Sequence, residues 1–252
     1  MKAIAGVAAA LLVVILTSAE PVLAQDAVPT EILARTLFIK WGNEMGTAFT
    51  FDYQGRLYLV TARHVVAGVP AVDAVIQIRQ GDQWKDYWTV RTIYPSSPDV
   101  DVAIFETSEK APAQGYIIEP SNSNSGVTFG QQVWFIGYPF GLESKFMGGK
   151  TFAFLKRGTM SAIDASNPDA IVLYIDGFNN PGFSGGPIIY WNFTTHKYEL
   201  MGVVKGYREE ATQQDINGQL VDTQILQNSG ILIAYSIKHV TDAIKESLRP
   251  KH

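Results

Sequence analysis

Short runs of β-forming residues, each closed by a cluster of turn residues, fill most of the chain from Thr36 onward. In the run 74–79 the two isoleucines share one face and Gln77 and Arg79 share the other, which is the period of a half-buried strand. Gly, Pro, Asp and Ser clusters separate the runs. The strand candidates are 56–61, 74–79, 87–91, 102–105, 132–136, 151–155, 170–175, 187–191, 200–204 and 231–234. This pattern predicts an all-β fold of many short strands, and it does not by itself separate barrels from a sandwich.

The strands are expected to form two groups. The stretch 121–126 is small, polar and without periodicity, so we expect a linker there between a first unit over 25–120 and a second over 127–236. Only the end of the chain has helical spacing, with apolar residues three and four positions apart. That spacing predicts a C-terminal helix over 237–249, which Pro250 closes.

The first 24 residues have the organisation of a secretory signal. Lys2 precedes an apolar run of 14 residues, 3–16, which is shorter than the ~20 residues that span a bilayer. A small residue, Ala24, stands at the expected cleavage site. The sequence therefore predicts export to the periplasm or the exterior of a bacterium, with an uncleaved membrane anchor as the alternative.

Composition limits the classes of function. Hydrophobic residues make up 46% of the 252 residues and charged residues 17%, which is typical of a globular chain with an ample core. The net charge is −4 and no basic run is present, which argues against a nucleic-acid partner. The chain has no cysteine, so disulfides and cysteine-based metal, redox or nucleophile chemistry are excluded.

The stretch 180–187, Asn-Pro-Gly-Phe-Ser-Gly-Gly-Pro, holds a serine among three glycines. Glycine accepts positive φ and lets other atoms approach closely, so Ser184 is expected on an exposed turn with backbone N–H groups nearby. A nucleophile and donors aimed at an oxyanion are the two requirements of acyl transfer. The alternative is an ordinary Gly/Pro/Ser loop.

A serine hydroxyl is a weak nucleophile unless a base, usually histidine, removes its proton. The chain offers four histidines. His64 follows a strand candidate, His196 lies in a polar connection between strands, His239 lies on the expected helix and His252 is the last residue. A carboxylate must then orient the imidazole, and Asp99 and a second aspartate two residues later are the candidates before the strand 102–105.

These segments together resemble chymotrypsin-like serine proteases, most closely the protease domain of the bacterial HtrA/Deg branch. Residues 180–187 resemble the nucleophile loop of that family, Thr-Ala-Arg-His-Val-Val at 61–66 its histidine motif, and Asp-Val-Ala-Ile at 101–104 its aspartate motif. Further similar segments are 46–50, 136–141, 158–161 and Asp176, so the resemblance covers most of the chain after residue 24.

The resemblance implies two six-stranded antiparallel β-barrels with a C-terminal helix, and a serine endopeptidase that needs no cofactor or metal. It assigns the nucleophile to Ser184, the base to His64 and the orienting carboxylate to Asp101, in preference to Asp99. It places the oxyanion between the N–H groups of Gly182 and Ser184.

Two positions depart from the family pattern. Phe183 stands where proteases activated by release of a new N-terminus carry an aspartate, so that activation switch is expected to be absent. Phe178 stands near the expected floor of the first specificity pocket. Val204, Lys205 and Gly206 resemble the strand edge that pairs with a substrate's main chain. With Ile231, which stands where a glycine often opens the pocket, these residues imply cleavage after small apolar residues.

Because the chain ends soon after the expected helix, the resemblance is to a stand-alone protease domain without the PDZ domain of HtrA proteins. Polypeptide is the expected partner, and the sequence does not set the oligomeric state. One rival is an α/β-hydrolase, with Asp215 or Asp222 and His239 as partners of the serine, but its strand–helix alternation is missing. The other rival is a catalytically silent protease fold that binds peptides.

Overall fold

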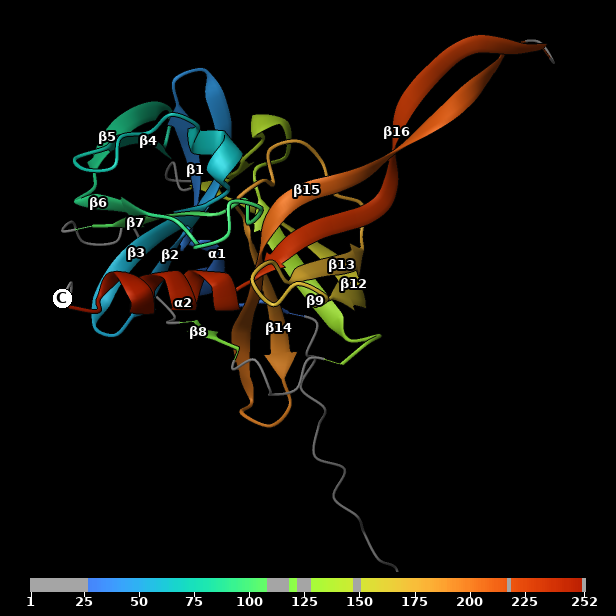
Figure 1. The fold of residues 1–252 in the computed structure, drawn as a ribbon. Coiled ribbons are helices and arrows are strands. Elements are labelled where there is room, and N and C mark those ends of the chain that lie inside the picture. The colour runs from blue at the N-terminus through green and yellow to red at the C-terminus, as the bar shows by residue number, and fades with distance from the viewer. Residues whose placement is uncertain (1–26, 108–117, 122–127, 147–150, 217–218, 251–252) are drawn as a thin grey trace, which may run out of the picture.

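The computed structural model describes residues 27–107, 118–121, 128–146, 151–216 and 219–250, and in strands β15 and β16 it describes the side chains only outside 213–224. Two curled β-sheets lie side by side, and one long helix ends the chain (Figure 1). The signal segment 1–24, residues 122–126 of the expected linker and His252 fall outside the described residues. Within the described ranges, no helix has the length and apolar character needed to cross a bilayer.

The first sheet has the strand order β5-β4-β1-β2-β3-β7-β6. Its strands are β1 (Thr36–Trp41), β2 (Glu44–Tyr53), β3 (Arg56–Thr61), β4 (Val75–Gln80), β5 (Gln83–Trp88), β6 (Arg91–Ile93) and β7 (Ala103–Glu106). A bridge between Val72, just before β4, and Arg91 on β6 pairs the last strand with the β4 side of the sheet, which closes it into a barrel. Only two residues separate β5 from β6, so counting them as one bent strand gives six strands.

The second sheet has the order β14-β9-β12-β13-β16-β15-β8, and pairing of β14 with β15 closes six of these strands into a barrel. Its strands are β8 (Glu119–Pro120), β9 (Gln132–Gly137), β12 (Phe154–Asp164), β13 (Val172–Asp176), β14 (Pro187–Asn192), β15 (Lys197–Ile216) and β16 (Gln219–Ser236). The two-residue β8 is a parallel addition outside the ring. It precedes the expected linker yet belongs to the second sheet. The predicted double-barrel fold is confirmed.

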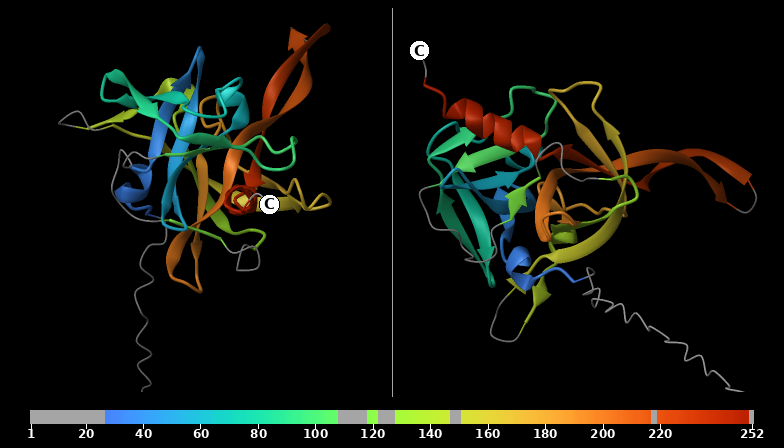
Figure 2. Two further views of the ribbon diagram at one scale, coloured as in Figure 1. Left: turned by 60° about the vertical axis from the view of Figure 1, so that its left-hand side comes forward. Right: turned by 90° about the horizontal axis from the view of Figure 1, so that it is seen from below.

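The remaining elements are short, apart from the terminal helix. They are α1 (Thr30–Leu33), η1 (Arg63–Val66), η2 (Pro139–Gly141), β10 (Ser144–Lys145), β11 (Thr151–Phe152) and α2 (Lys238–Ser247). The predicted helix is confirmed, and Figure 2 shows it lying across the end of the first barrel although it follows the second. Its buried Val240, Ala243 and Ile244 join a cluster with residues of both barrels, so α2 ties the two barrels together.

Two predicted strands are interrupted. The candidate 87–91 breaks at Thr89, whose main-chain N–H and hydroxyl both bond to the carbonyl of Ala74. The candidate 151–155 breaks at Ala153, which is buried between β11 and β12. In both places the strand stops at a buried residue, which alternation along the sequence does not reveal.

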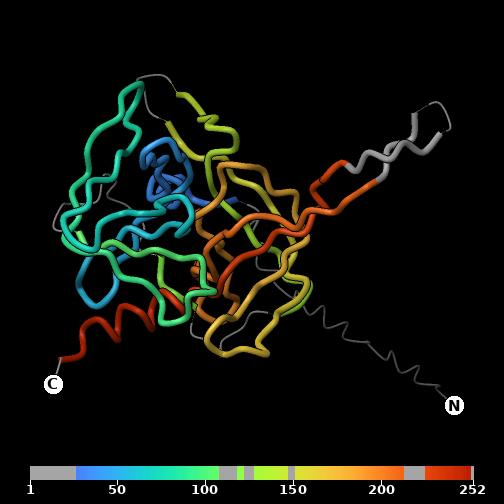
Figure 3. The backbone as a smooth tube through the Cα atoms, turned by 45° about the horizontal axis from the view of Figure 1, so that its top comes forward, coloured from blue at the N-terminus to red at the C-terminus, as the bar shows by residue number. Residues whose placement is uncertain are grey.

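A long hairpin arm is the feature that sequence periodicity missed. Strands β15 and β16 continue far beyond the barrel as a two-stranded ribbon (Figures 1 and 3). The predicted strands 200–204 and 231–234 cover only the base of this arm, where most side chains are buried. Residues such as Arg208, Glu209 and Glu210 are exposed, and the ladder of main-chain hydrogen bonds holds them in strands without burial of an apolar face.

Candidate active site

His64 and Asp101 lie together at the edge of the first barrel. His64 lies on η1, directly after β3, and Asp101 precedes β7, which pairs with β3. The Nδ1 atom of His64 lies 2.5 Å from Oδ2 of Asp101, and the His64 main-chain N–H donates to Oδ1 at 2.9 Å. The Asp101 carboxylate therefore hydrogen-bonds to both the ring and the main chain of His64. With Nδ1–H donated to Asp101, the Nε2 atom of the neutral ring is an acceptor.

Ser184 follows a type II β-turn in the second barrel. The Phe183 N–H donates to the Asn180 carbonyl at 3.3 Å, Pro181 occupies the second position of the turn and Gly182 the third, with φ +102°. The Pro181 carbonyl accepts the Phe140 N–H at 2.7 Å. Because that peptide is trans, the N–H of Gly182 points away from Phe140. Among the described residues, no acceptor bonds the N–H of Gly182 or Ser184.

The serine loop docks on the first barrel beside the His64 turn. The Ser184 carbonyl accepts the Thr47 N–H at 2.9 Å. A Cβ on Gly185 would lie 2.2 Å from the Thr47 carbonyl oxygen and 2.6 Å from the N atom of Ala62, so only glycine fits there. Gly185, directly after Ser184, therefore brings Ser184 against the segment that leads into His64.

The Ser184 hydroxyl donates to the carbonyl of Lys205 at 3.0 Å. Lys205 belongs to the predicted substrate edge, with Val204 buried and Gly206 half-buried on β15. Val204 is hydrogen-bonded to the serine loop. Its carbonyl accepts the Gly185 N–H at 2.8 Å, and its N–H donates to the Gly186 carbonyl at 2.9 Å. The predicted pocket residue Phe178 is 56% exposed, so its ring does not form a closed floor.

The other candidates lie elsewhere. Asp99 accepts at its main-chain oxygen from the Tyr235 hydroxyl, and its N–H bonds to the Ser97 hydroxyl, as in a turn residue. His196 is exposed in the β14–β15 turn. His239 is buried on α2, where Nε2 accepts the Ile171 N–H at 2.8 Å. Burial, reinforced by neighbouring Lys238, lowers the pKa of His239.

Three residues at the site had no assigned role from the sequence. Thr47 is fully buried, and its hydroxyl donates to the Gly182 carbonyl at 2.6 Å and accepts the Tyr138 N–H at 3.1 Å. Phe140 adopts φ +52°, and its N–H donates to the Pro181 carbonyl. Lys156 reaches the loop from β12. Thr47 and Phe140 lie in segments whose resemblance was noted, whereas Lys156 carried no sequence signal.

Phe183 is fully buried beneath the serine loop, with its ring 5.2 Å from that of Phe135. A Cβ on Gly137 would lie 2.6 Å from the Phe183 ring, so a glycine on β9 makes room for it. In proteases activated by a new N-terminus, an aspartate at this position binds the terminal ammonium. Here the position holds a buried aromatic ring that packs against Phe135.

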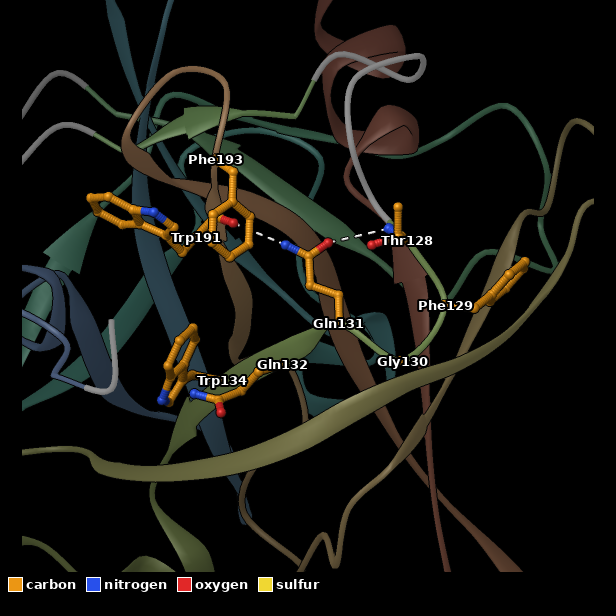
Figure 4. Close-up of a pocket in the computed structure, with 8 residues that line it drawn as sticks. All are labelled: Thr128, Phe129, Gly130, Gln131, Gln132, Trp134, Trp191 and Phe193. Atoms are coloured by element: carbon orange, nitrogen blue, oxygen red, sulfur yellow. Dashed lines mark hydrogen bonds between the residues drawn. The ribbon is translucent and has the colours of Figure 1, made fainter. Parts of the chain in front are cut away.

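A separate cavity of about 380 Å³ lies beside β9 and β14 (Figure 4). Its lining residues are Thr128, Phe129, Gly130, Gln131, Gln132, Trp134, Trp191 and Phe193. The Gln131 side chain donates to the Trp191 carbonyl at 2.9 Å and accepts the Thr128 N–H at 3.2 Å. None of the predicted site residues lines this cavity. In the described part of the chain, no group of three or more His, Asp or Glu side chains is placed to hold a metal ion.

The family described as "Trypsin-like peptidase domain" matches residues 46–192, more than half of the chain. The chain belongs to the trypsin-like peptidase family. This trypsin-like peptidase is 29% identical over 144 residues to Protease Do-like 1, chloroplastic, of Arabidopsis thaliana. The match covers 57% of the chain and 30% of that relative, so the chain spans about a third of the relative's length. The expected resemblance to HtrA/Deg protease domains is confirmed.

Solved structures with the same fold include Rv3671c of M. tuberculosis in two inactive forms. The serine-to-alanine mutant is 19% identical with a TM-score of 0.54, and the match covers 88% of this peptidase and 92% of that chain. The other inactive form is 19% identical with a TM-score of 0.55, covering 91% and 97%. At this identity the likeness supports the fold. The chain therefore has the chymotrypsin-like double-barrel fold of the trypsin-like peptidase family, and the α/β-hydrolase alternative is wrong.

Proposed function

We propose that the chain is an exported serine endopeptidase in which Ser184, His64 and Asp101 form the catalytic triad. The observation that carries the proposal is the pair of hydrogen bonds between Asp101 and His64. Oδ2 lies 2.5 Å from the ring Nδ1, and Oδ1 accepts the main-chain N–H at 2.9 Å. This pair of bonds holds the imidazole in the tautomer whose Nε2 can take a proton. Docking of the serine loop against Thr47 and Ala62 supports the presence of Ser184 beside that ring.

The proposed reaction begins when Ser184 turns its hydroxyl from the Lys205 carbonyl toward His64. Ser184 Oγ attacks the scissile carbonyl carbon while His64 Nε2 takes the hydroxyl proton. The negative charge that develops on the carbonyl oxygen is stabilised by the N–H groups of Gly182 and Ser184. The C–N bond then breaks, His64 gives its proton to the leaving amine, and water hydrolyses the acyl-enzyme by the same steps in reverse roles.

The turn conformation supports the oxyanion assignment. In the type II turn the Pro181 carbonyl is directed to Phe140, and the two proposed donors bond no acceptor in the described part of the protein. A flip of the Pro181–Gly182 peptide would give a type I turn and aim a carbonyl at the oxyanion instead. The described conformation thus has the donors free for a substrate oxygen.

Substrate preference and location are further parts of the proposal. The pocket positions Phe178 and Ile231 are uncharged, so a basic side chain would lack a counter-ion there. We therefore expect cleavage after Val, Ala or Leu, and cleavage after Lys or Arg in a peptide library would contradict this. Export to the periplasm or beyond rests on the signal-like segment 1–24, and detection of the uncleaved chain in the cytoplasm would contradict it.

The test of the triad is labelling with a fluorophosphonate probe, which phosphonylates an activated serine. We expect labelling of the wild type and of His239→Ala, and loss of labelling in Ser184→Ala and His64→Ala. His239→Ala is the matched control, because it removes a buried imidazole outside the site. A wild type that is not labelled would instead favour a silent, peptide-binding protease fold.

A further inference from the structure

Lys156 reaches the serine loop from the neighbouring strand β12. Its ammonium donates to the main-chain carbonyl of Phe178 and, at 2.9 Å, to the side-chain oxygen of Asn180. The same Nζ atom lies 5.5 Å from the centre of the Phe178 ring and 5.8 Å from that of Phe183. One cation therefore contacts three residues of the segment that ends at the nucleophile.

The strand places this charge in an unusual setting. Along β12, Gly158 and Met160 are buried, whereas Arg157 and Thr159 are exposed. Half-buried Lys156 therefore shares the inward face of the strand with Gly158 and Met160. Desolvation of an ammonium costs free energy unless acceptors replace its water. No salt bridge to Lys156 is found among the described residues, and the carbonyl, the amide oxygen and the faces of the rings take that role.

The contacted residues control the turn that carries Gly182. Asn180 is the first residue of the type II turn, and its carbonyl accepts the N–H that closes it. Asn179, between the two residues that Lys156 bonds, is 1% exposed, and its carbonyl accepts from the side chain of Asn228 on β16. The segment is thus held by Lys156 on β12 and by Asn228 at the base of the arm.

We propose that Lys156 is a positioning residue that holds the oxyanion turn in its type II form. In proteases with an aspartate at the position of Phe183, the ammonium group of a new N-terminus pairs with that aspartate, and Lys156 would take the place of that ammonium here. This rests on the proposed triad mechanism. In this chain the ammonium comes permanently from a strand, and it meets the face of Phe183 and the oxygens of Phe178 and Asn180. The turn therefore needs no newly released N-terminus.

The experiment measures the second-order rate of fluorophosphonate labelling for Lys156→Met, Lys156→Arg and Arg157→Met. Methionine keeps the length and apolar stem of lysine and removes the charge. Arginine keeps the charge and can donate to both oxygens. Arg157 is adjacent on β12 with an exposed side chain on the opposite face, which makes it the matched control. The phosphonyl oxygen occupies the oxyanion position, so the rate reports on the Gly182 and Ser184 donors.

We expect Lys156→Met to lower the labelling rate by ~10²-fold, the usual effect of losing an oxyanion donor. Lys156→Arg should stay within about tenfold of the wild type, since the charge-assisted bonds persist, and Arg157→Met should label like the wild type. With a peptide substrate, the loss in Lys156→Met should fall on kcat and not on KM. If the wild type is labelled and Lys156→Met is labelled at a similar rate, the positioning role is overturned and the triad stands. If the wild type is not labelled, the triad itself is contradicted.

Thermal unfolding accompanies each rate. If Lys156→Met does not fold, Asn180→Ala decides, because it removes one acceptor and leaves the lysine in place. We then expect about a tenfold loss of labelling, the kinetic equivalent of a charge-assisted hydrogen bond. An unchanged labelling rate in a folded Asn180→Ala would overturn the proposal.

Discussion

The hydroxyl of Thr47 donates to the carbonyl of Gly182 at 2.6 Å, and the two residues stand 135 positions apart in the chain. Thr47 lies on β2 of the first barrel and Gly182 on the serine loop of the second. The same oxygen accepts the N–H of Tyr138 at 3.1 Å. A single buried hydroxyl therefore connects the first barrel, the 138–141 segment and the proposed oxyanion turn.

Replacing Thr47 by valine keeps the shape and removes the hydroxyl. We expect the fluorophosphonate labelling rate to fall about tenfold and the stability to fall by about 1–3 kcal/mol, because the Tyr138 N–H and the Gly182 carbonyl lose their partner. Labelling kinetics and urea denaturation measure the two effects. Thr47→Ser is the control, since it keeps the hydroxyl, and a slow Thr47→Ser with a fast Thr47→Val would contradict the account.

Gly182→Ala should be close to inactive. Its φ of +102° disfavours any side chain, and a Cβ would lie 2.1 Å from the Tyr138 carbonyl oxygen, so the turn must leave its type II form. We expect a loss of labelling of at least ~10²-fold. Gly81→Ala is the control, because it shares a positive φ (+58°) but meets nothing within 4 Å. It should lose about 1 kcal/mol of stability and label normally.

The labelling rate should fall at alkaline pH through loss of the Lys156 charge. Burial lowers the pKa of Lys156 below its ordinary value of 10.5, so the ammonium is lost as pH rises through a folded-state pKa that lies below that value. Arginine stays protonated throughout this range. A rate profile from pH 7 to 10.5 should therefore show an alkaline decline that is weaker in Lys156→Arg, and superimposable profiles would contradict the prediction.

Buried His239 should make stability sensitive to acid. Its pKa is lowered by burial, so the folded state favours the neutral ring that accepts from Ile171. The associated stability is present above pH 6.5, the ordinary value, and is lost as pH falls through the lowered folded-state pKa. Urea midpoints between pH 7.5 and 5 should fall less steeply in His239→Gln, whereas replacing exposed His196 by Gln should leave the wild-type slope.

Local patterns predicted much of the fold. The strand β3 matches its predicted range 56–61, and α2 lies within 237–249, because alternation and helical spacing record which side of each segment is buried. The outer arm was missed because its strands, where their side chains are described, have no buried face to record. The interruptions at Thr89 and Ala153 were missed because they depend on the contacts of a buried residue in the folded chain, and not on its neighbours in sequence.

The sequence by itself determined the class of fold, the trypsin-like family and the residues proposed for the triad, because each motif needs a particular residue at a particular local spacing. Only the tertiary structure decided how those motifs are held. Thr47 and Lys156 act on the serine loop across the barrel interface and from a neighbouring strand, and the Ser184 hydroxyl rests on Lys205. Such contacts depend on how the strands and the two barrels pack together, which is a collective property of the whole core and leaves no trace in the spacing of any one segment.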